Sequence, residues 1–446
     1  MRYFFILGTN PTLSVAEILS HTNLRSRIIT NLPLITQIKN ELKANIESLS
    51  DEVLVVKSKE IRHIESLLDG LGGTIKIGKI YTNITRMNTN INPNEIIDII
   101  LDLRNKYPNK KIYFGFSLYR LSLDVTPKNL KNLTWEIKKL GMEVKRKLKK
   151  FGFASRWVTS KDLALSSVVV KKNKLLTNGA EIVILVGKDK ICLAKTLAVQ
   201  EFEEYSLRDY GRPSRDILSG IMPPKLAKIM INLAQISLDK IILDPFCGSG
   251  TILQEALLMG YKNIVGSDSN KKAIEGAQKN LEWLINRYKV EGMRYKVFRT
   301  DVRRISKKIG SNSVDAIVTE PYLGPLKVKN LKFITEELSK LYLEVFQEFK
   351  KILKKDGRII MIWPIFKLKN RETEKLKNRK TKELKDNLLF LPILEEVKKL
   401  GFKVINPLPQ EIRNHPVIKL TNRSSIIYSR PDQKILREMF IFSRKT

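Results

Sequence analysis

The chain has 446 residues, of which 43% are hydrophobic and 28% are charged, so a folded protein of about two to four domains is expected. Lys and Arg number 81 against 46 Asp and Glu, which gives a net charge of +35 at pH 7. Such a charge favours a polyanionic partner, either nucleic acid or an anionic membrane. A generally lysine-rich proteome is the alternative explanation.

The few cysteines and histidines narrow the chemistry. Cys192 and Cys247 are the two cysteines, too few for a disulfide scaffold or a multi-cysteine zinc site. The three histidines show no ligand spacing, so we predict no metal. The chain start lacks the pattern of a signal peptide, no stretch resembles a membrane helix, and the basic stretches lack a matched apolar face. We therefore expect a cytoplasmic protein that does not bind membranes.

The first segment alternates between strand and helix patterns. Tyr3–Leu7 and Val53–Val56 are apolar runs typical of strands. Ser14 followed by Glu17 fits a capping box that opens a helix. The alternation predicts a small α+β domain over residues 1–74.

The second segment, residues 75–200, combines strands with a strongly basic helix. Ile112–Leu118 alternates like a strand, and Glu136–Lys150 reads as a helix with one basic face, followed by Phe151 and Trp157. Cations beside aromatic rings suit phosphate contacts and base stacking, although a solvated charged helix has the same composition. The predicted RNA-binding residues are Lys145, Arg146, Lys149, Lys150, Arg156, Lys171, Lys172 and Lys174.

Residues 201–216 are polar and are interrupted by Gly211 and Pro213, which predicts a linker. In residues 217–446 strand and helix patterns then alternate, as in a doubly wound parallel sheet. Within this region Lys367–Asp386 is lysine-rich, and both an exposed helix and a loop fit that composition.

The strongest chemical signal is a glycine loop between a buried strand and a helix. Asp244–Gly250 reads DPFCGSG and precedes an apolar helical pattern. Gly248 and Gly250 allow the backbone to approach a ligand closely. The third glycine of a dinucleotide fingerprint is missing, and Asp244 would repel a pyrophosphate while attracting a cation such as the amino group of S-adenosylmethionine. A nicotinamide oxidoreductase is therefore disfavoured.

Three further predicted strands end beside acids. Asp268 follows the second strand at nearly the spacing of a carboxylate that binds ribose hydroxyls. Asp301 follows the third strand, where it can accept from an adenine amine, and Glu320 follows the fourth. Four acids in register at one sheet edge indicate a nucleoside-binding site.

These motifs resemble a known enzyme family. Asp244–Thr251 (DPFCGSGT) is similar to the first motif of class I S-adenosylmethionine-dependent methyltransferases. Arg208–Leu233, with RDYGRPSRD and PPKLAKIMINL, and the opening YFFILGTNPTLSVAEI resemble the THUMP-domain tRNA guanosine-10 N2-methyltransferase family. The resemblance implies an α/β fold: a Rossmann-like, doubly wound sheet with a C-terminal antiparallel hairpin, preceded by an α+β ferredoxin-like domain at 1–74 and a THUMP domain at 75–200.

The family also implies S-adenosylmethionine as cofactor, tRNA as partner and the N2 amine of guanosine 10 as methyl acceptor. By the same resemblance Asp268 holds the ribose and Asp301 meets the adenine. The residues implied to line the cofactor are Asp244, Phe246, Gly248 and Gly250.

The fourth motif departs from the family pattern Asp-Pro-Pro-Tyr. Here the chain reads Glu320, Pro321, Tyr322 and Leu323, so the acid is one methylene longer and the aromatic residue is displaced. We predict that Glu320 and the backbone carbonyl of Pro321 accept the N–H bonds of the target amine, while Tyr322 stacks on the base. The base must leave its stack to reach them.

Two alternatives remain open at this point. The same chemistry can act on another base, such as an N2-guanosine elsewhere in tRNA or rRNA or an N6-adenosine. A catalytically silent RNA-binding scaffold is the other possibility. An activating protein partner, the number of methyl groups added and the oligomeric state are not determined by the sequence.

Overall fold

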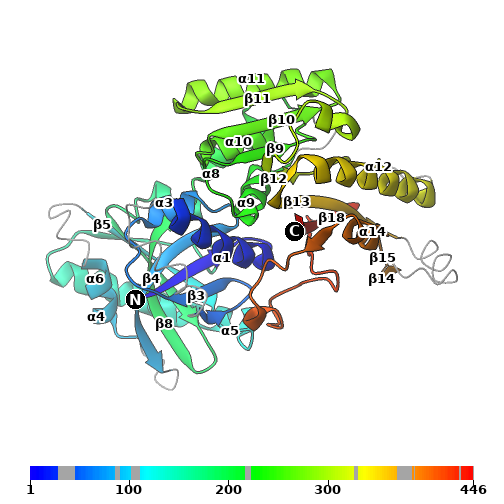
Figure 1. Cartoon of the computed structure of the whole chain (residues 1–446). Coiled ribbons are helices and arrows are strands. Elements are labelled where there is room, and N and C mark those ends of the chain that lie inside the picture. Colours follow the sequence, from blue (N-terminus) through cyan, green and yellow to red (C-terminus); the bar gives the residue numbers. More distant parts are fainter. Residues whose placement is uncertain are drawn as a thin grey trace. The chain divides into compact units, whose positions relative to one another are not determined.

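The computed structural model describes residues 1–28, 46–85, 91–101, 111–215, 222–325, 330–368, 384–385, 387–430 and 433–444 (Figure 1). The described residues form two compact units, Met1–Glu204 and Tyr205–Thr446. Among these residues, no helix has the length and apolar character needed to cross a bilayer. Most of the basic stretch Lys367–Asp386 lies outside the described residues.

The first unit is built on one eight-stranded sheet with the order β2-β3-β1-β4-β8-β7-β5-β6. The pairs β5–β7 and β5–β6 are parallel, and the other neighbours are antiparallel. Its strands are β1 (Arg2–Leu7), β2 (Ile46–Leu49), β3 (Val53–Lys57), β4 (Thr74–Thr85), β5 (Ile112–Arg120), β6 (Ser155–Val158), β7 (Gly179–Val186) and β8 (Lys190–Val199). Its helices are α1 (Pro11–Ile28), α3 (Ile64–Asp69), α4 (Pro93–Leu101), α5 (Pro127–Asn132), α6 (Thr134–Lys150) and α7 (Ser167–Lys172).

The predicted boundary between residues 74 and 75 falls at the start of β4. That strand pairs with β1 on one side and with β8 on the other, so the sheet continues through the boundary. The described residues before Tyr205 thus form one compact unit where the sequence suggested two domains. Strand pairing between distant segments carries no local sequence signal.

The predicted capping box is wrong. Helix α1 begins before Ser14, and the side chain of Asn10 accepts a hydrogen bond from a backbone N–H of the first turn at 3.0 Å. Glu17 lies inside the helix and is fully buried, where its two oxygens accept from the backbone N–H groups of Gly72 and Gly73 at 2.7 Å each. Its role is therefore to tie α1 to the turn before β4.

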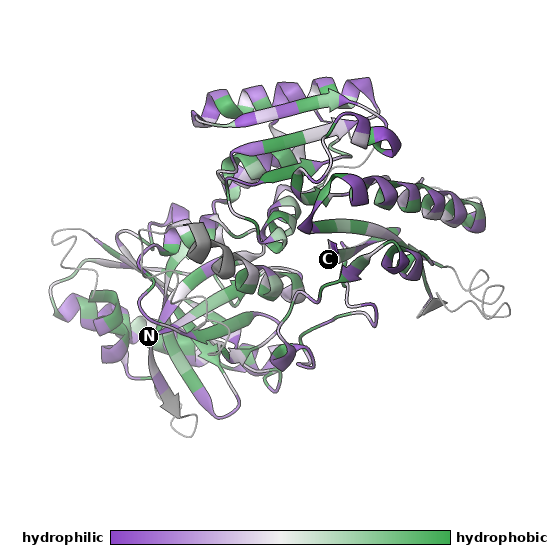
Figure 2. Ribbon diagram, viewed as in Figure 1, coloured by the Kyte–Doolittle hydropathy of each residue, from purple (hydrophilic) through white to green (hydrophobic). Residues whose placement is uncertain are grey.

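Helix α6 confirms the predicted basic helix and shows why it forms. Ile137, Leu140, Val144 and Leu148 recur at helical spacing and are buried against the sheet. Gly141 lies on the same face, where an added Cβ would meet the Trp157 ring at 2.7 Å. The opposite face carries the lysines and arginines, and Figure 2 shows this alternation of hydrophobic and hydrophilic residues.

The second unit contains a ten-stranded sheet. Its strands are β9 (Ile241–Asp244), β10 (Asn263–Asp268), β11 (Arg294–Arg299), β12 (Val314–Thr319), β13 (Leu353–Lys367), β14 (Leu384–Lys385), β15 (Leu388–Phe390), β16 (Phe402–Val404), β17 (Ile426–Tyr428) and β18 (Ile435–Arg444). Its helical elements are α9 (Pro224–Ala234), α10 (Thr251–Leu258), α11 (Lys271–Tyr288), η2 (Val302–Lys307), α12 (Leu331–Ile352), α14 (Leu394–Lys399) and η3 (Gln410–Ile412).

The strand order of this sheet confirms the predicted class. Strands β11, β10, β9, β12 and β13 are neighbours in that order and run parallel, and β18 pairs antiparallel with β13. Strand β17 pairs antiparallel with β18, as expected for the C-terminal hairpin. The order reverses beside β9, so this edge of the sheet is where a ligand is expected.

The segment predicted as a linker is partly helical. Residues Phe202–Tyr210 form α8, and the division between the two units falls within this helix. Arg208 of α8 is buried, and its Nε atom lies 2.7 Å from Oε1 of Glu255 in α10. The polar composition suggested a solvated linker, but part of it serves a buried ion pair.

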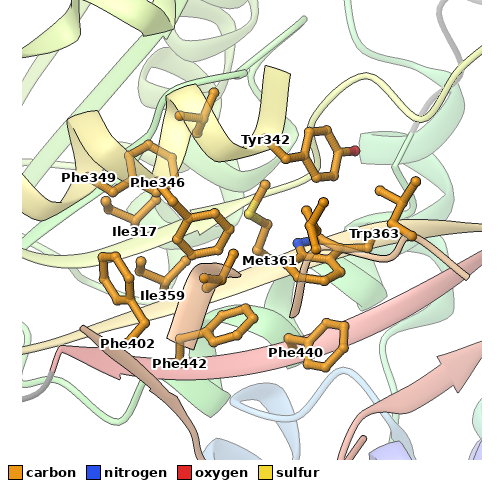
Figure 3. Packing of buried hydrophobic residues seen from close by; sticks show 14 of the residues in the cluster. Ile317, Tyr342, Phe346, Phe349, Ile359, Met361, Trp363, Phe402, Phe440 and Phe442 are labelled. Carbon is orange, nitrogen blue, oxygen red and sulfur yellow. The ribbon is translucent and has the colours of Figure 1, made fainter. Parts of the chain in front are cut away.

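An aromatic cluster forms the core between α12 and the C-terminal strands. The ring of Phe346 lies edge-on to those of Phe402 and Phe442, with centroids 5.2 Å away in both cases (Figure 3). Trp363 of β13 lies within 6.1 Å of Phe346 and is fully buried. These contacts hold α12 and β18 against β13.

Candidate active site

The glycine loop lies between β9 and α10, as the sequence predicts. Gly248 and Gly250 have φ values of +49° and +84°, in the left-handed region that favours glycine. A Cβ on Gly250 would lie 3.2 Å from the Cβ of Ala277, whereas a Cβ on Gly248 would meet nothing within 4 Å. The backbone at Gly248 therefore leaves room for a ligand.

Asp244 is buried at the end of β9. Its Oδ1 accepts hydrogen bonds from the Thr319 hydroxyl at 2.7 Å and from the backbone N–H of Phe246 at 3.2 Å. Burial raises the pKa of Asp244 to about 7, and the nearby negative charges of Asp268 and Glu320 add to that rise. A cation bound here would remove the cost of ionising this carboxyl group.

Asp268 ends β10, the strand next to β9. Its Oδ2 accepts from the backbone N–H of Gly248 at 3.0 Å, and its Oδ1 accepts from that of Asn270 at 2.9 Å. A carboxylate offers about four lone-pair sites, so these two bonds leave acceptors for a pair of ribose hydroxyls. The structure thus brings Asp268 to the glycine loop.

Asp301 follows β11, the strand next to β10. Its carboxylate caps η2 by accepting from the backbone N–H of Arg303 at 2.9 Å. The guanidinium of Arg303 also donates to it, and this pairing lowers the pKa of Asp301. Asp301 thus lies at the predicted strand end and is ionised, but it shares its oxygens with Arg303.

Glu320 has a partner that the sequence analysis missed. Arg437 on β18 donates to both carboxylate oxygens of Glu320, with a distance of 3.1 Å from Nη2 to Oε2. The side chains of Arg437 and Glu320 are only 11% and 14% exposed. Burial lowers the pKa of Arg437, but the charge of Glu320 and its hydrogen bonds raise that pKa above its ordinary value. The longer glutamate of the altered fourth motif reaches across to the C-terminal strand.

The next two residues of this motif differ in exposure. Pro321 is buried, whereas Tyr322 is 58% exposed. The backbone carbonyl of Tyr322 accepts from the hydroxyl of Tyr342 at 3.0 Å, and Tyr342 is buried, which raises its pKa. The loop is therefore anchored through its backbone, while Tyr322 is exposed.

Two other contributors to the site were not predicted. Thr319 directly precedes the fourth motif and donates to Asp244, so its position was a usable signal. Asn280 of α11 is fully buried, and its Nδ2 donates to the backbone carbonyls of Ser214 and Ser249 at 2.9 Å each. Nothing in the local sequence marks Asn280 or Arg437, because their partners are distant in the chain.

The predicted RNA-binding residues all lie on the surface of the first unit. Four are on α6, where Trp135 and Met142 are also exposed at 70% and 63%. Lys171 of α7 forms an ion pair with Glu201. The eight exposed residues are Lys145, Arg146, Lys149 and Lys150 of α6, Arg156 of β6, Lys171 and Lys172 of α7, and Lys174 beyond it. Within the described part of the chain, no group of three His, Cys, Asp or Glu side chains could hold a metal ion.

Comparisons with known proteins agree with this site. The UPF0020 family model, described as an RMKL-like methyltransferase domain, matches residues 212–388. A Methanothermobacter thermautotrophicus protein named tRNA (guanine(10)-N2)-dimethyltransferase is 36% identical over 179 residues, which cover 40% of this chain and 48% of that protein. A Methanocaldococcus jannaschii protein of the same name is 32% identical over 182 residues, 39% of this chain and 48% of that protein. The chain therefore spans about half the length of these curated relatives.

A solved structure supports the fold. The crystal structure of TrmN from Thermus thermophilus matches with a TM-score of 0.51 and 13% identity, covering 100% of both chains. At this identity the match shows the fold alone. Together with the strand order, the match over residues 212–388 agrees with the methyltransferase resemblance found in the sequence.

Proposed function

We propose that this chain transfers a methyl group from S-adenosylmethionine to the exocyclic N2 amine of guanosine 10 in tRNA. The observation that carries the proposal is a set of acids at one edge of the parallel sheet: Asp244, Asp268 and Glu320 lie at the ends of neighbouring strands, and Asp268 contacts the glycine loop. Relatives of this chain named tRNA (guanine(10)-N2)-dimethyltransferase suggest the substrate class.

The residues present fit the cofactor. Asp244 is a buried carboxyl group with a raised pKa, which suits pairing with an ammonium group. Asp268 has acceptor sites left for ribose hydroxyls, and Gly248 leaves open space for the rest of the molecule. S-adenosylmethionine supplies a methyl group that is already electrophilic, so the protein mainly has to align donor and acceptor.

The acceptor side needs groups that localise the amine lone pair. Glu320 can accept from the target amine because Arg437 occupies about half of the roughly four lone-pair sites of its carboxylate. The carbonyl of Pro321 is the second acceptor, and Tyr322 is the platform on which the extruded base stacks. Arg437 holds the Glu320 carboxylate in place through hydrogen bonds to both of its oxygens.

The basic residues of the first unit are the proposed RNA anchor. Exchanging Lys145 and Lys149 of α6 for glutamate should weaken tRNA binding and flatten its salt dependence, because phosphate contacts release counterions. Fluorescence anisotropy at several salt concentrations measures both effects, and the double exchange Lys307→Glu/Lys308→Glu in the second unit serves as a charge-matched control. Equal losses in the two variants would exclude a specific role for α6.

The proposed activity is tested by nucleoside mass spectrometry. Purified protein is incubated with unmodified tRNA and isotope-labelled S-adenosylmethionine, and the digested RNA is searched for labelled nucleosides. Labelled N2-methylguanosine, mapped to position 10, is the expected result. Labelled methyladenosine would show that the altered fourth motif selects another base. An RNA-binding scaffold would bind tRNA and leave no label.

We expect cofactor affinity to fall as the pH drops below about 7. The protonated carboxyl of Asp244 cannot pair with an ammonium group, and its pKa of about 7 places this loss near neutrality. Below that pKa the dissociation constant should rise by up to about tenfold per pH unit. Calorimetric titrations between pH 5.5 and 8 measure the slope. Asp244→Asn should bind weakly at every pH, and an unchanged slope in this variant would assign the dependence to another group.

Asp268→Ala should weaken cofactor binding by about 10- to 100-fold, because hydrogen bonds from the ribose to a charged acceptor are lost. Binding of tRNA should remain nearly intact. Asp239→Ala is the matched control, since that side chain is 67% exposed just before β9. If both variants bind S-adenosylmethionine like the unmodified protein, Asp268 does not hold the ribose.

A further inference from the structure

One buried cation beside the glycine loop is incompletely paired. Arg212 follows α8 and is only 4% exposed. Its Nη1 donates to the hydroxyl of Thr251, the first residue of α10, at 2.6 Å. Its Nε and Nη2 atoms are buried and have no hydrogen-bond partner among the described residues. A buried guanidinium with two unused donor nitrogens costs free energy that an anion placed there would recover.

The neighbouring charges do not supply that anion. Glu255 of α10 is buried, and its two oxygens are engaged by Arg208, at 2.7 Å and 3.4 Å. Lys228 of α9 lies 3.8 Å from the same carboxylate. Burial lowers the pKa of Arg212, the charge of Asp209 opposes that effect in part, and the charge of Arg215 adds to it. None of these acids makes a hydrogen bond to the Nε or Nη2 atom of Arg212 among the described residues. The start of α10 therefore carries an excess of buried positive charge.

The segment that bears Arg212 is tied to the glycine loop at two points. Arg212 reaches Thr251, the residue directly after Gly250. Two residues later, the backbone of Ser214 exchanges hydrogen bonds of 2.8 Å and 2.9 Å with the amide of Asn280, which also holds the carbonyl of Ser249. Helix α9 lies beside α10 (Figure 1), and Arg208 of α8 contacts Glu255 of α10. An anion held by Arg212 would thus lie against the proposed cofactor site.

We propose that Arg212 binds the carboxylate of the amino-acid end of S-adenosylmethionine. This inference rests on the proposed cofactor. The amino-acid end of that molecule carries an ammonium group, which Asp244 can pair with, and a carboxylate, which needs a cation of its own. Arg212 is held through Nη1 only, so Nε and Nη2, which share one edge of the planar guanidinium, remain for a carboxylate in the fork geometry that guanidinium groups favour.

The test compares two ligands that differ by this carboxylate. Binding of S-adenosylmethionine and of decarboxylated S-adenosylmethionine is measured by calorimetry on the full chain and on Arg212→Gln. We expect the substitution to weaken the binding of S-adenosylmethionine by about 10- to 100-fold, because this ligand loses a charge-assisted pair. The affinity for decarboxylated S-adenosylmethionine should stay nearly unchanged. The preference of the unmodified protein for the carboxylate should therefore collapse in the variant.

Controls separate this role from a structural one. Arg215→Gln removes the same charge from an exposed side chain three residues away and should leave the preference intact. Arg212→Lys keeps a charge without the fork and should give an intermediate loss, which also provides a folded variant if Arg212→Gln unfolds. An equal loss of affinity for both ligands, or no loss of affinity for either, would overturn the inference. If the unmodified protein binds neither ligand, the proposed cofactor itself is wrong.

Discussion

Replacing Arg437 with alanine is expected to reduce methyl transfer by about 100- to 1000-fold while cofactor affinity changes little. Arg437 donates to both oxygens of Glu320, and the two side chains are largely buried. Without the guanidinium, the largely buried carboxyl group of Glu320 loses the partner that fixes its orientation, so it ceases to be an aligned acceptor for the target amine. Single-turnover transfer to tRNA measures the loss.

Three variants distinguish positioning from simple loss of stability. Arg437→Lys should recover part of the rate because it keeps the positive charge. The recovery should be incomplete because lysine cannot form the bidentate contact. The rate of methyl transfer in Glu320→Ala should fall at least as far as in Arg437→Ala. The double variant Arg437→Ala/Glu320→Ala should be no slower than Glu320→Ala alone, because the effects of residues that act as a unit are not additive. Thermal melting of each variant with bound S-adenosylmethionine is the stability control. Multiplicative losses would mean that Arg437 does not act through Glu320.

Phe346→Ala should lower the free energy of unfolding of the second unit by about 3–5 kcal/mol. The ring is fully buried in α12 and packs edge-on against aromatic rings from three other segments (Figure 3). Its removal deletes those contacts and leaves a cavity that the surrounding β-structure cannot readily close. Urea unfolding followed by the fluorescence of Trp363, a neighbour in the same cluster, measures the change.

Phe333→Ala is the matched control for this experiment. Phe333 lies on the first turn of the same helix and is 54% exposed, so its truncation should change stability by no more than about 0.5 kcal/mol. If the two variants unfold alike, the aromatic cluster is not what holds α12 to the sheet.

Local patterns were sufficient to predict the parallel sheet and its glycine loop. Asp244–Gly250 combines a strand end, two glycines and an acid within seven positions, and the structure places them as predicted between β9 and α10. Asp268 and Glu320 follow strands that the apolar runs predict. These predictions succeed because strand, turn and helix propensities act between residues close in the chain.

Other local patterns were misleading because tertiary contacts use the same residues differently. Glu17 fits a capping box, yet it binds the backbone of a turn more than fifty residues away. The polar segment 201–216 resembles a linker, yet it contains α8 and the buried Arg208. A buried charge and an exposed one have the same sequence signature until the partner is known.

The sequence by itself determined the chemistry at the sheet edge: the order of the strands' terminal acids, the glycine loop and the resemblance to a methyltransferase. Only the tertiary structure decided how those acids are partnered. Arg437 lies 117 residues from Glu320, and Asn280 lies 66 residues from Ser214. Both contacts arise because strand pairing and helix packing bring distant segments together, and no local propensity encodes that proximity.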